Sequence, residues 1–293
     1  MRSRILKAWL LVTGLALLGG CSALRLAYDN GPTLVWWWLD GYGDFSGAQA
    51  QRVKDDIRSW FQWHRKAQLE GYAAWLDSVQ PKLLDSVTPA QMCSWADEAR
   101  RQLEPALQQA LATMASWVAD LSEAQLAHIA QRYAKANDEL RREHLQPDPE
   151  KRRAAALRRL QDRFELFYGR LDAAQERLLT QALASSPMDP ERWLAEREQR
   201  QRQTLRTLRE LVASQADRAR AIAALRAVLA DVERSPDPAY RAYQQRLREF
   251  NCALAARVHE SSSAAQRQLL RERVQGWRDD LRLLASQAFA LPD

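Results

Sequence analysis

The chain has 293 residues, of which 43 are Lys or Arg and 37 are Asp or Glu, so its formal net charge is +6. At 46% hydrophobic residues it is too apolar for an intrinsically disordered chain. It holds only 10 glycines, and just three isoleucines follow residue 20. A β-sandwich needs many glycine-bearing turns and β-branched strands, and a doubly wound α/β fold needs Val/Ile runs, so the composition argues against both classes.

The first 20 residues have the order of a secretory signal. Three basic residues precede an apolar run at 8–18, and the small pair Gly19-Gly20 leads directly into Cys21. The apolar run is shorter than the roughly 20 residues that span a bilayer. We therefore expect residues 1–20 to be a cleaved lipoprotein signal peptide and Cys21 to be acylated. The alternative is a plain signal peptide that happens to be followed by a cysteine.

The expected mature chain begins at Cys21, has 273 residues and carries a formal charge of +3, because three basic residues lie in the leader. Several acyl chains on one cysteine would anchor it firmly to a membrane. Asp after the acylated cysteine is the usual sign of inner-membrane retention, and Ser22 stands there instead. The expected location is the outer membrane, with the chain lipid-anchored and facing the periplasm.

Two further cysteines, Cys93 and Cys252, would then lie in an oxidising compartment. A disulfide between them would tie distant parts of the chain together. Against it, Cys252 points away from the apolar stripe of its own segment. The sequence leaves the bridge and two free thiols as equal alternatives.

A recurring pattern marks helix starts: an N-cap residue followed three positions later by Gln, which is the capping box. Asp followed by Pro marks three more starts, with Pro at the first helical position. The five boxes begin at Ser46, Thr88, Ser122, Asp172 and Ser263, and the three Asp-Pro pairs begin at Asp148, Asp189 and Asp237. Apolar residues spaced by three and four follow these starts. We predict an all-α protein: an elongated multi-helix bundle of about nine helices with no β-sheet.

The expected organisation has two parts after the signal peptide. Residues 21–45 would form the lipidated tether and a Trp-rich first helix, and residues 46–293 the helical bundle. The turn near residue 147, with a proline on each side of Asp148, is the best candidate for a boundary within the bundle.

The densest aromatic feature is Trp36-Trp37-Trp38 with Tyr42, close to the expected anchor. Three consecutive Trp cover most of a helix circumference, so one face cannot bury them all. Trp favours the membrane interface, since its ring is apolar and its N–H polar. The cluster either packs in the core or partly faces the membrane or a partner.

A basic cluster surrounds the turn near residue 147. It consists of Arg141, Arg142, Lys151, Arg152 and Arg153. Such a patch would suit anionic lipid headgroups or lipopolysaccharide phosphates, whereas nucleic acid is not an expected partner outside the cytoplasm. The alternative is a solvated face balanced by nearby glutamates. A second basic run follows at 197–209.

The four histidines are scattered singly, and no pair has metal-ligand spacing, so we expect no metal site and no cofactor. His64 lies on an apolar stripe, where a histidine bonded to a carbonyl or carboxylate is expected rather than a catalytic base.

Three segments resemble a family of Gram-negative lipoproteins of unknown function. They are Cys21-Ser22-Ala23-Leu24-Arg25-Leu26-Ala27-Tyr28, Trp37-Trp38-Leu39-Asp40-Gly41-Tyr42 and Trp63-His64-Arg65. The resemblance implies a lipid-anchored helical protein and transfers no catalytic residues. The strings Leu121-Ser122-Glu123-Ala124-Gln125 and Leu171-Asp172-Ala173-Ala174-Gln175 are also similar to the Leu-Thr-x-x-Gln boxes of small periplasmic chaperones of the Spy type.

The expected function is a non-enzymatic binding or scaffolding role in the envelope, through a protein partner, an unfolded client or a headgroup. A Spy-like chaperone is the first alternative. A hydrolase of envelope polymers is the second, and it would need two carboxylates that converge in a cleft beside His64, with Asp40, Asp44 and Asp55 as candidate acids.

Overall fold

The structure is a computed structural model that describes residues 21–287. The predicted signal peptide, residues 1–20, lies outside the described residues. Within them the chain forms α-helices joined by short turns and contains no β-strand, which confirms the predicted all-α class. The helices are α2 (Cys21–Asp29), α3 (Gly31–Gly43), α4 (Gly47–Ala67), α5 (Leu69–Val79), α6 (Pro89–Met114), α7 (Glu123–His144), α8 (Pro149–Tyr168), α9 (Ala173–Ser185), α10 (Pro190–Ala213), α11 (Arg218–Glu233), α12 (Pro238–Glu260) and α13 (Ala264–Gln287), with 3₁₀ turns η1 (Gln80–Leu84) and η2 (Val118–Asp120).

The described residues contain 12 α-helices, so the predicted number of about nine was wrong. The three additional helices are α2, α5 and α11. The break between α4 and α5 falls at Gln68, where no Pro or Gly marks it. Helix α11 begins after Asp217, which caps the amide of Arg220 without a Gln at the third helical position.

All eight predicted starts coincide with helix N-termini in the structure. The reciprocal bonds of the capping box are present at Thr88, Ser122, Asp172 and Ser263. Ser46 is the exception, since its side chain makes no capping bond. The side chain of Gln49, its expected box partner, bonds instead with Gln125 and with the carbonyl of Asp120.

The capping glutamines also join helices that are distant in the sequence. The Gln125 amide donates to the Gly43 carbonyl at 2.6 Å and to Gln49 Oε1 at 2.8 Å, which ties the start of α7 to the start of α4. Gln175 and Gln266 are joined by their side-chain amides at 3.0 Å, which does the same for α9 and α13. A pattern that predicts helix ends therefore also fixes tertiary contacts.

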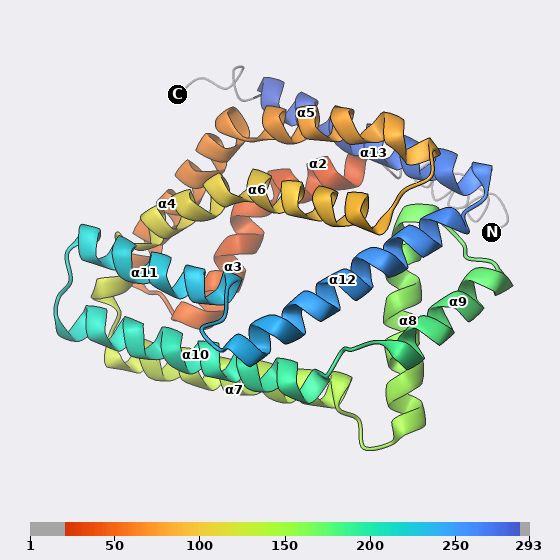
Figure 1. Cartoon of the computed structure of the whole chain (residues 1–293). Helices are drawn as coiled ribbons and strands as arrows, with labels where there is room; N and C mark the ends of the chain where they lie inside the picture. The colour runs from red at the N-terminus through yellow and green to blue at the C-terminus, as the bar shows by residue number, and fades with distance from the viewer. Residues whose placement is uncertain (1–20, 288–293) are drawn as a thin grey trace, which may run out of the picture.

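Helices pair side by side and together form a frame (Figure 1). Helices α5 and α13 lie together along one edge, α7 and α10 along another, and α12 crosses diagonally between them and meets α6. Helix α2 packs on α13, where Arg25 Nε lies 3.0 Å from Asp280 Oδ1. None of the described helices is long and apolar enough to cross a membrane.

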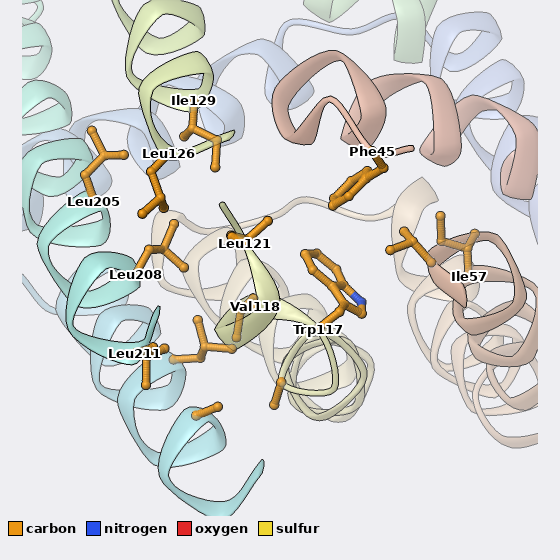
Figure 2. Packing of buried hydrophobic residues seen from close by; sticks show 14 residues of the cluster. Phe45, Ile57, Trp117, Val118, Leu121, Leu126, Ile129, Leu205, Leu208 and Leu211 are labelled. Atoms are coloured by element: carbon orange, nitrogen blue, oxygen red, sulfur yellow. The ribbon is translucent and has the colours of Figure 1, made fainter. Parts of the chain in front are cut away.

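Two main hydrophobic clusters hold the frame together. The first includes Phe45, Ile57 and Trp117 with leucines of α7 and α10, as Figure 2 shows, and Leu225 of α11 belongs to the same cluster. The second gathers side chains of α5, η1, α8, α9, α12 and α13. Both clusters draw residues from before and after the turn near residue 147, so that turn does not separate one core from the other.

Candidate functional site: clefts beside the aromatic helix

Helix α3 divides its three consecutive Trp between the core and the surface. Trp36 is half-buried and packs against the first cluster, with the Phe45 ring 6.1 Å away and Lys54 Nζ 4.5 Å above its own ring. Trp37 and Trp38 are 65% and 64% exposed. The indoles therefore cannot act as one unit, and Trp38 with Tyr42, 5.3 Å apart between ring centroids, forms the aromatic surface that matters below.

The turn after α3 fixes the position of Phe45, which lines the same cleft as Trp38 and Tyr42. Asp44 ends the helix in a left-handed conformation with φ of 44°, and its N–H donates to the Asp40 carbonyl at 2.9 Å. The Asp40 carboxylate then accepts from the backbone N–H of Phe45 at 3.1 Å. These bonds turn the Phe45 ring inward, edge-on to Trp117 at 5.3 Å (Figure 2).

An apolar cleft of about 460 Å³ opens between α3, α7, α10 and α11. Its walls include Trp38, Phe45, Trp117, Tyr133 and Leu208. A smaller compartment of about 210 Å³ lies on the other side of Trp38, toward α4, and presents no polar surface. Trp38, Leu39, Met114 and Trp117 line both, so the two compartments are neighbours that share an apolar wall.

One face of α10 gives the larger cleft a polar end. Arg197, Arg200, Gln201 and Thr204 line it at spacings of three and four, and Leu208 continues the same face into the apolar end. Arg197 Nε donates to Asn137 Oδ1 at 3.2 Å, and Asn137 in turn donates to Gln201 at 2.6 Å. Arg200 Nη1 donates to the carbonyl of Val232 at 3.5 Å. Across residues 21–287, neither guanidinium has a carboxylate within ion-pair distance.

A third, basic cleft of about 750 Å³ continues from Arg200 between α6, α10 and α12. Arg100, Arg234 and Arg241 line it, with Glu233 as the acidic group on its wall. The aromatic pair Tyr240 and Tyr243 forms another side. Since Arg200 lines both the basic and the apolar cleft, the polarity changes at this residue.

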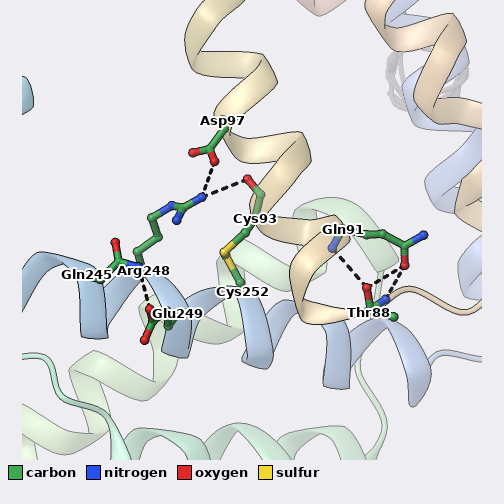
Figure 3. Close-up of a disulfide and its surroundings, with 8 residues drawn as sticks. All are labelled: Thr88, Gln91, Cys93, Asp97, Gln245, Arg248, Glu249 and Cys252. Carbon is green, nitrogen blue, oxygen red and sulfur yellow. Dashed lines mark hydrogen bonds and ion pairs between the residues drawn. A yellow bond between two sulfur atoms is a disulfide. The ribbon is translucent and has the colours of Figure 1, made fainter.

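The disulfide alternative is present in the structure: Cys93 of α6 and Cys252 of α12 are bonded, with their Cα atoms 5.4 Å apart (Figure 3). Beside it, the Arg248 guanidinium pairs with the Asp97 carboxylate and reaches the Cys93 carbonyl at 3.4 Å. Cys252 is buried and also lines the basic cleft, so the bridge fixes one wall of that cleft.

The basic cluster at the turn near residue 147 is partly neutralised. Arg141 pairs with Asp138 and Glu198, and Lys151 lies 3.9 Å from Asp148. Arg152 is half-buried and donates to the carbonyl of Gln146 at 2.9 Å. Arg142 and Arg153 are exposed. Most of the predicted anion-contact residues are thus engaged locally.

The two buried histidines have both ring nitrogens occupied. His64 Nδ1 and Nε2 bond the hydroxyls of Tyr28 and Tyr72 at 2.9 and 3.2 Å, and burial lowers its pKa to about 4. His259 bonds the Tyr168 hydroxyl and the carbonyl of Asp85, both at 2.9 Å, and burial lowers its pKa as well. These contacts are structural, because neither ring has a free lone pair for a reacting group.

Two of the three candidate acids of the hydrolase alternative have fixed partners, and the third, Asp44, ends helix α3. Asp40 caps the turn described above, and Asp55 pairs with Arg58 and Gln51. The described part of the chain contains no cluster of His, Cys, Asp and Glu suited to a metal ion.

Sequence reasoning placed Arg197 and Arg200 in a basic run and ranked them below the cluster near residue 147. The available signal was their spacing, because a face that reads Arg197, Arg200, Gln201, Thr204, Leu208 passes from charged to apolar over three turns. The other walls of the cleft come from α3, α7 and α11, and no local pattern brings those helices together.

These features define an all-α protein with a graded apolar-to-basic cleft. Residues 41–241 match the model of a family of unknown function, DUF6279, and the chain belongs to that family. The matched region includes Trp63-His64-Arg65 and the polar face of α10, while Cys21 and Trp36–Trp38 precede it. No curated protein and no solved structure matches the chain.

Proposed function

We propose that this protein is an outer-membrane lipoprotein that faces the periplasm and binds a ligand or partner without catalysing a reaction. The observation that carries the binding role is the set of neighbouring clefts, two of them apolar and lined in common by Trp38, and a third, basic one that shares Arg200 with the larger apolar cleft. Concave sites with a few convergent polar groups are the usual form of a ligand site.

The position of the clefts supports a role close to the membrane. Trp38 follows Cys21 by 17 residues, nearly all of them within α2 and α3. At a helical rise of ~1.5 Å per residue, the Trp38 wall lies at most about 26 Å from an anchor at Cys21. A ligand that leaves the bilayer surface has only a short path to the site.

A non-catalytic role is supported by how the candidate catalytic groups are used. Both nitrogens of His64 bond tyrosine hydroxyls, and the Asp40 carboxylate holds a backbone turn. Groups with such fixed partners serve packing and orientation rather than proton transfer.

Replacement of the acylation site tests the anchoring. Cys21→Ala should move the protein from the membrane fraction to the soluble fraction, while its helical circular dichroism spectrum stays unchanged. Ser22→Asp is the matched variant: it keeps the cysteine, and we expect it to move the protein from the outer to the inner membrane on a density gradient. An unchanged membrane fraction in Cys21→Ala would overturn the anchor.

A chaperone is the second candidate, because the clefts combine basic and apolar surface in one concavity. The test is light scattering of a reduced, aggregating protein with and without the purified lipoprotein. Suppression at equimolar amounts favours this role, and unchanged aggregation argues against it.

A further inference from the structure

We propose that the clefts bind an anionic amphiphile, with its acyl chain on the two sides of Trp38 and its anionic head at Arg197 and Arg200. This inference rests on the proposed binding function and names its ligand class. Fatty acids, lysophospholipids and phospholipids share the required chemistry, which is a flexible apolar tail joined to oxygens that carry negative charge.

The tail site is the apolar region around Trp38. Its compartments of about 460 and 210 Å³ are within or close to the usual size range of ligand pockets, roughly 300–1,000 Å³. The smaller compartment exposes no polar surface. A polypeptide would bring backbone amides that find no hydrogen-bond partner there, whereas an acyl chain has no such groups. This asymmetry favours a lipid tail over an unfolded client.

The head site is the polar end of the α10 face. Arg197 and Arg200 are half-buried, and bonds to Asn137 and to the Val232 carbonyl orient them. Their hydrogen-bond partners are neutral oxygens, and within residues 21–287 no carboxylate lies within ion-pair distance of either group, although Glu233 lines the basic cleft together with Arg200. A carboxylate or phosphate at the cleft would supply the missing charge through short, charge-assisted hydrogen bonds.

The order of polarity along α10 sets the ligand's direction. Leu208 lies at the apolar end, Thr204 and Gln201 lie between, and Arg200 lies where the apolar cleft meets the basic one. A simple carboxylate would end at Arg200. A phosphate-bearing headgroup would extend past it toward Arg234 and Arg241 in the cleft of about 750 Å³. The two lipid classes should therefore differ in their dependence on the residues beyond Arg200.

Photocrosslinking of the lipidated protein in phosphatidylcholine vesicles tests the proposal. The probe is a long-chain fatty acid with a diazirine in its chain, and mass spectrometry maps the adducts. We expect adducts on α3 and on the cleft face of α10. Arg200→Gln should weaken labelling by the fatty acid about tenfold, since the variant loses a charge-assisted hydrogen bond to the carboxylate. Labelling by the matching fatty alcohol should stay the same.

Two further variants keep the result interpretable. Arg206→Gln removes an exposed arginine from the same helix, bonded there to Gln203, and should leave labelling unchanged. Thr204→Phe fills the cleft without a change in charge and should reduce labelling by both acid and alcohol. Thermal unfolding of each variant identifies any that fail to fold. Adducts that lie outside the clefts, or that Arg200→Gln and Thr204→Phe both leave unchanged, would overturn the proposal.

Competition separates the sources of the ligand. Displacement by lysophosphatidylglycerol, weakened in Arg234→Gln, would support a phospholipid whose head extends into the basic cleft. Displacement by unlabelled fatty acid alone would support a free acid. Displacement by an unfolded protein and by neither lipid would overturn the proposal in favour of the chaperone role. All of these outcomes are independent of Cys21→Ala, so loss of the ligand claim leaves the anchoring claim intact.

Discussion

At the scale of single residues, the two buried histidines show how packing removes a charge. The His64 ring stacks on Trp60 at 4.6 Å between centroids and lies between the hydroxyls of Tyr28 and Tyr72. Burial favours the neutral ring and lowers the pKa of His64 from 6.5 to about 4. The bond to Tyr72 also spans the break at Gln68, so the neutral ring joins α4 to α5.

This pKa shift predicts an acid-sensitive fold. The unfolded chain binds a proton at His64 below about pH 6.5, whereas the folded chain resists it until about pH 4. His64 therefore costs no stability above pH 6.5, and the folded state loses up to about 3 kcal/mol as the pH falls from 6.5 to 4. Urea unfolding of wild type and His64→Gln at pH 7.5 and 4.5 measures the difference. The variant should lose less stability over this interval, because it lacks the titration of His64 and the titrating carboxylates are common to both proteins. Equal losses would contradict the assignment.

At the scale of elements, the end of α3 shows how a helix terminus shapes a site. Gly43 is buried, and a Cβ atom there would lie 2.3 Å from the Phe45 ring, far inside any allowed contact. Gly41, one half-turn earlier on the same helix, has its nearest neighbour 3.9 Å from such a Cβ atom, on the Arg132 side chain. The tight turn that directs the Phe45 ring to the cleft wall therefore requires glycine at position 43 but not at position 41.

The pair provides a matched test of that turn. Gly43→Ala should displace the Phe45 ring from its contact with Trp117 and destabilise the protein by about 1–3 kcal/mol, as overpacking does. Gly41→Ala should be neutral or stabilise by up to about 1 kcal/mol, because Ala is the better helix former. Denaturant unfolding with Trp fluorescence measures both variants. Similar effects of the two substitutions would argue against the packing described at Phe45.

At the scale of the whole molecule, the sequence predicts local structure better than arrangement. Capping boxes and Asp-Pro pairs locate eight helix starts, because each requires only neighbouring residues. The break at Gln68 could not be predicted in this way, because no Pro or Gly stands at that position. The His64–Tyr72 hydrogen bond that spans it is a tertiary contact. The clefts escape it as well: Trp38, Trp117 and Arg200 come from three segments that only tertiary packing unites.

The disulfide is the strongest single constraint on that arrangement. It joins α6 to α12 across 159 residues, so it limits the expansion of the unfolded chain over more than half of its length. The chain-entropy model gives about 5 kcal/mol for a loop of this length, and removal of a native disulfide typically costs about 2–5 kcal/mol. The double variant Cys93→Ser with Cys252→Ser should lose this stability, and its unfolding should show a steeper denaturant dependence because more surface becomes exposed.

Reduction of the wild type is the matched control for the double variant. Wild-type protein in dithiothreitol should unfold at the same denaturant concentration as the double variant, while the double variant itself should not respond to the reductant. The Arg248–Asp97 pair joins the same two helices without a covalent bond, so α6 and α12 should stay in register and the circular dichroism should remain helical. If reduced and oxidised wild type unfold alike, the bridge does not constrain the unfolded chain, and the contacts of α6 with α12 alone hold that wall of the basic cleft.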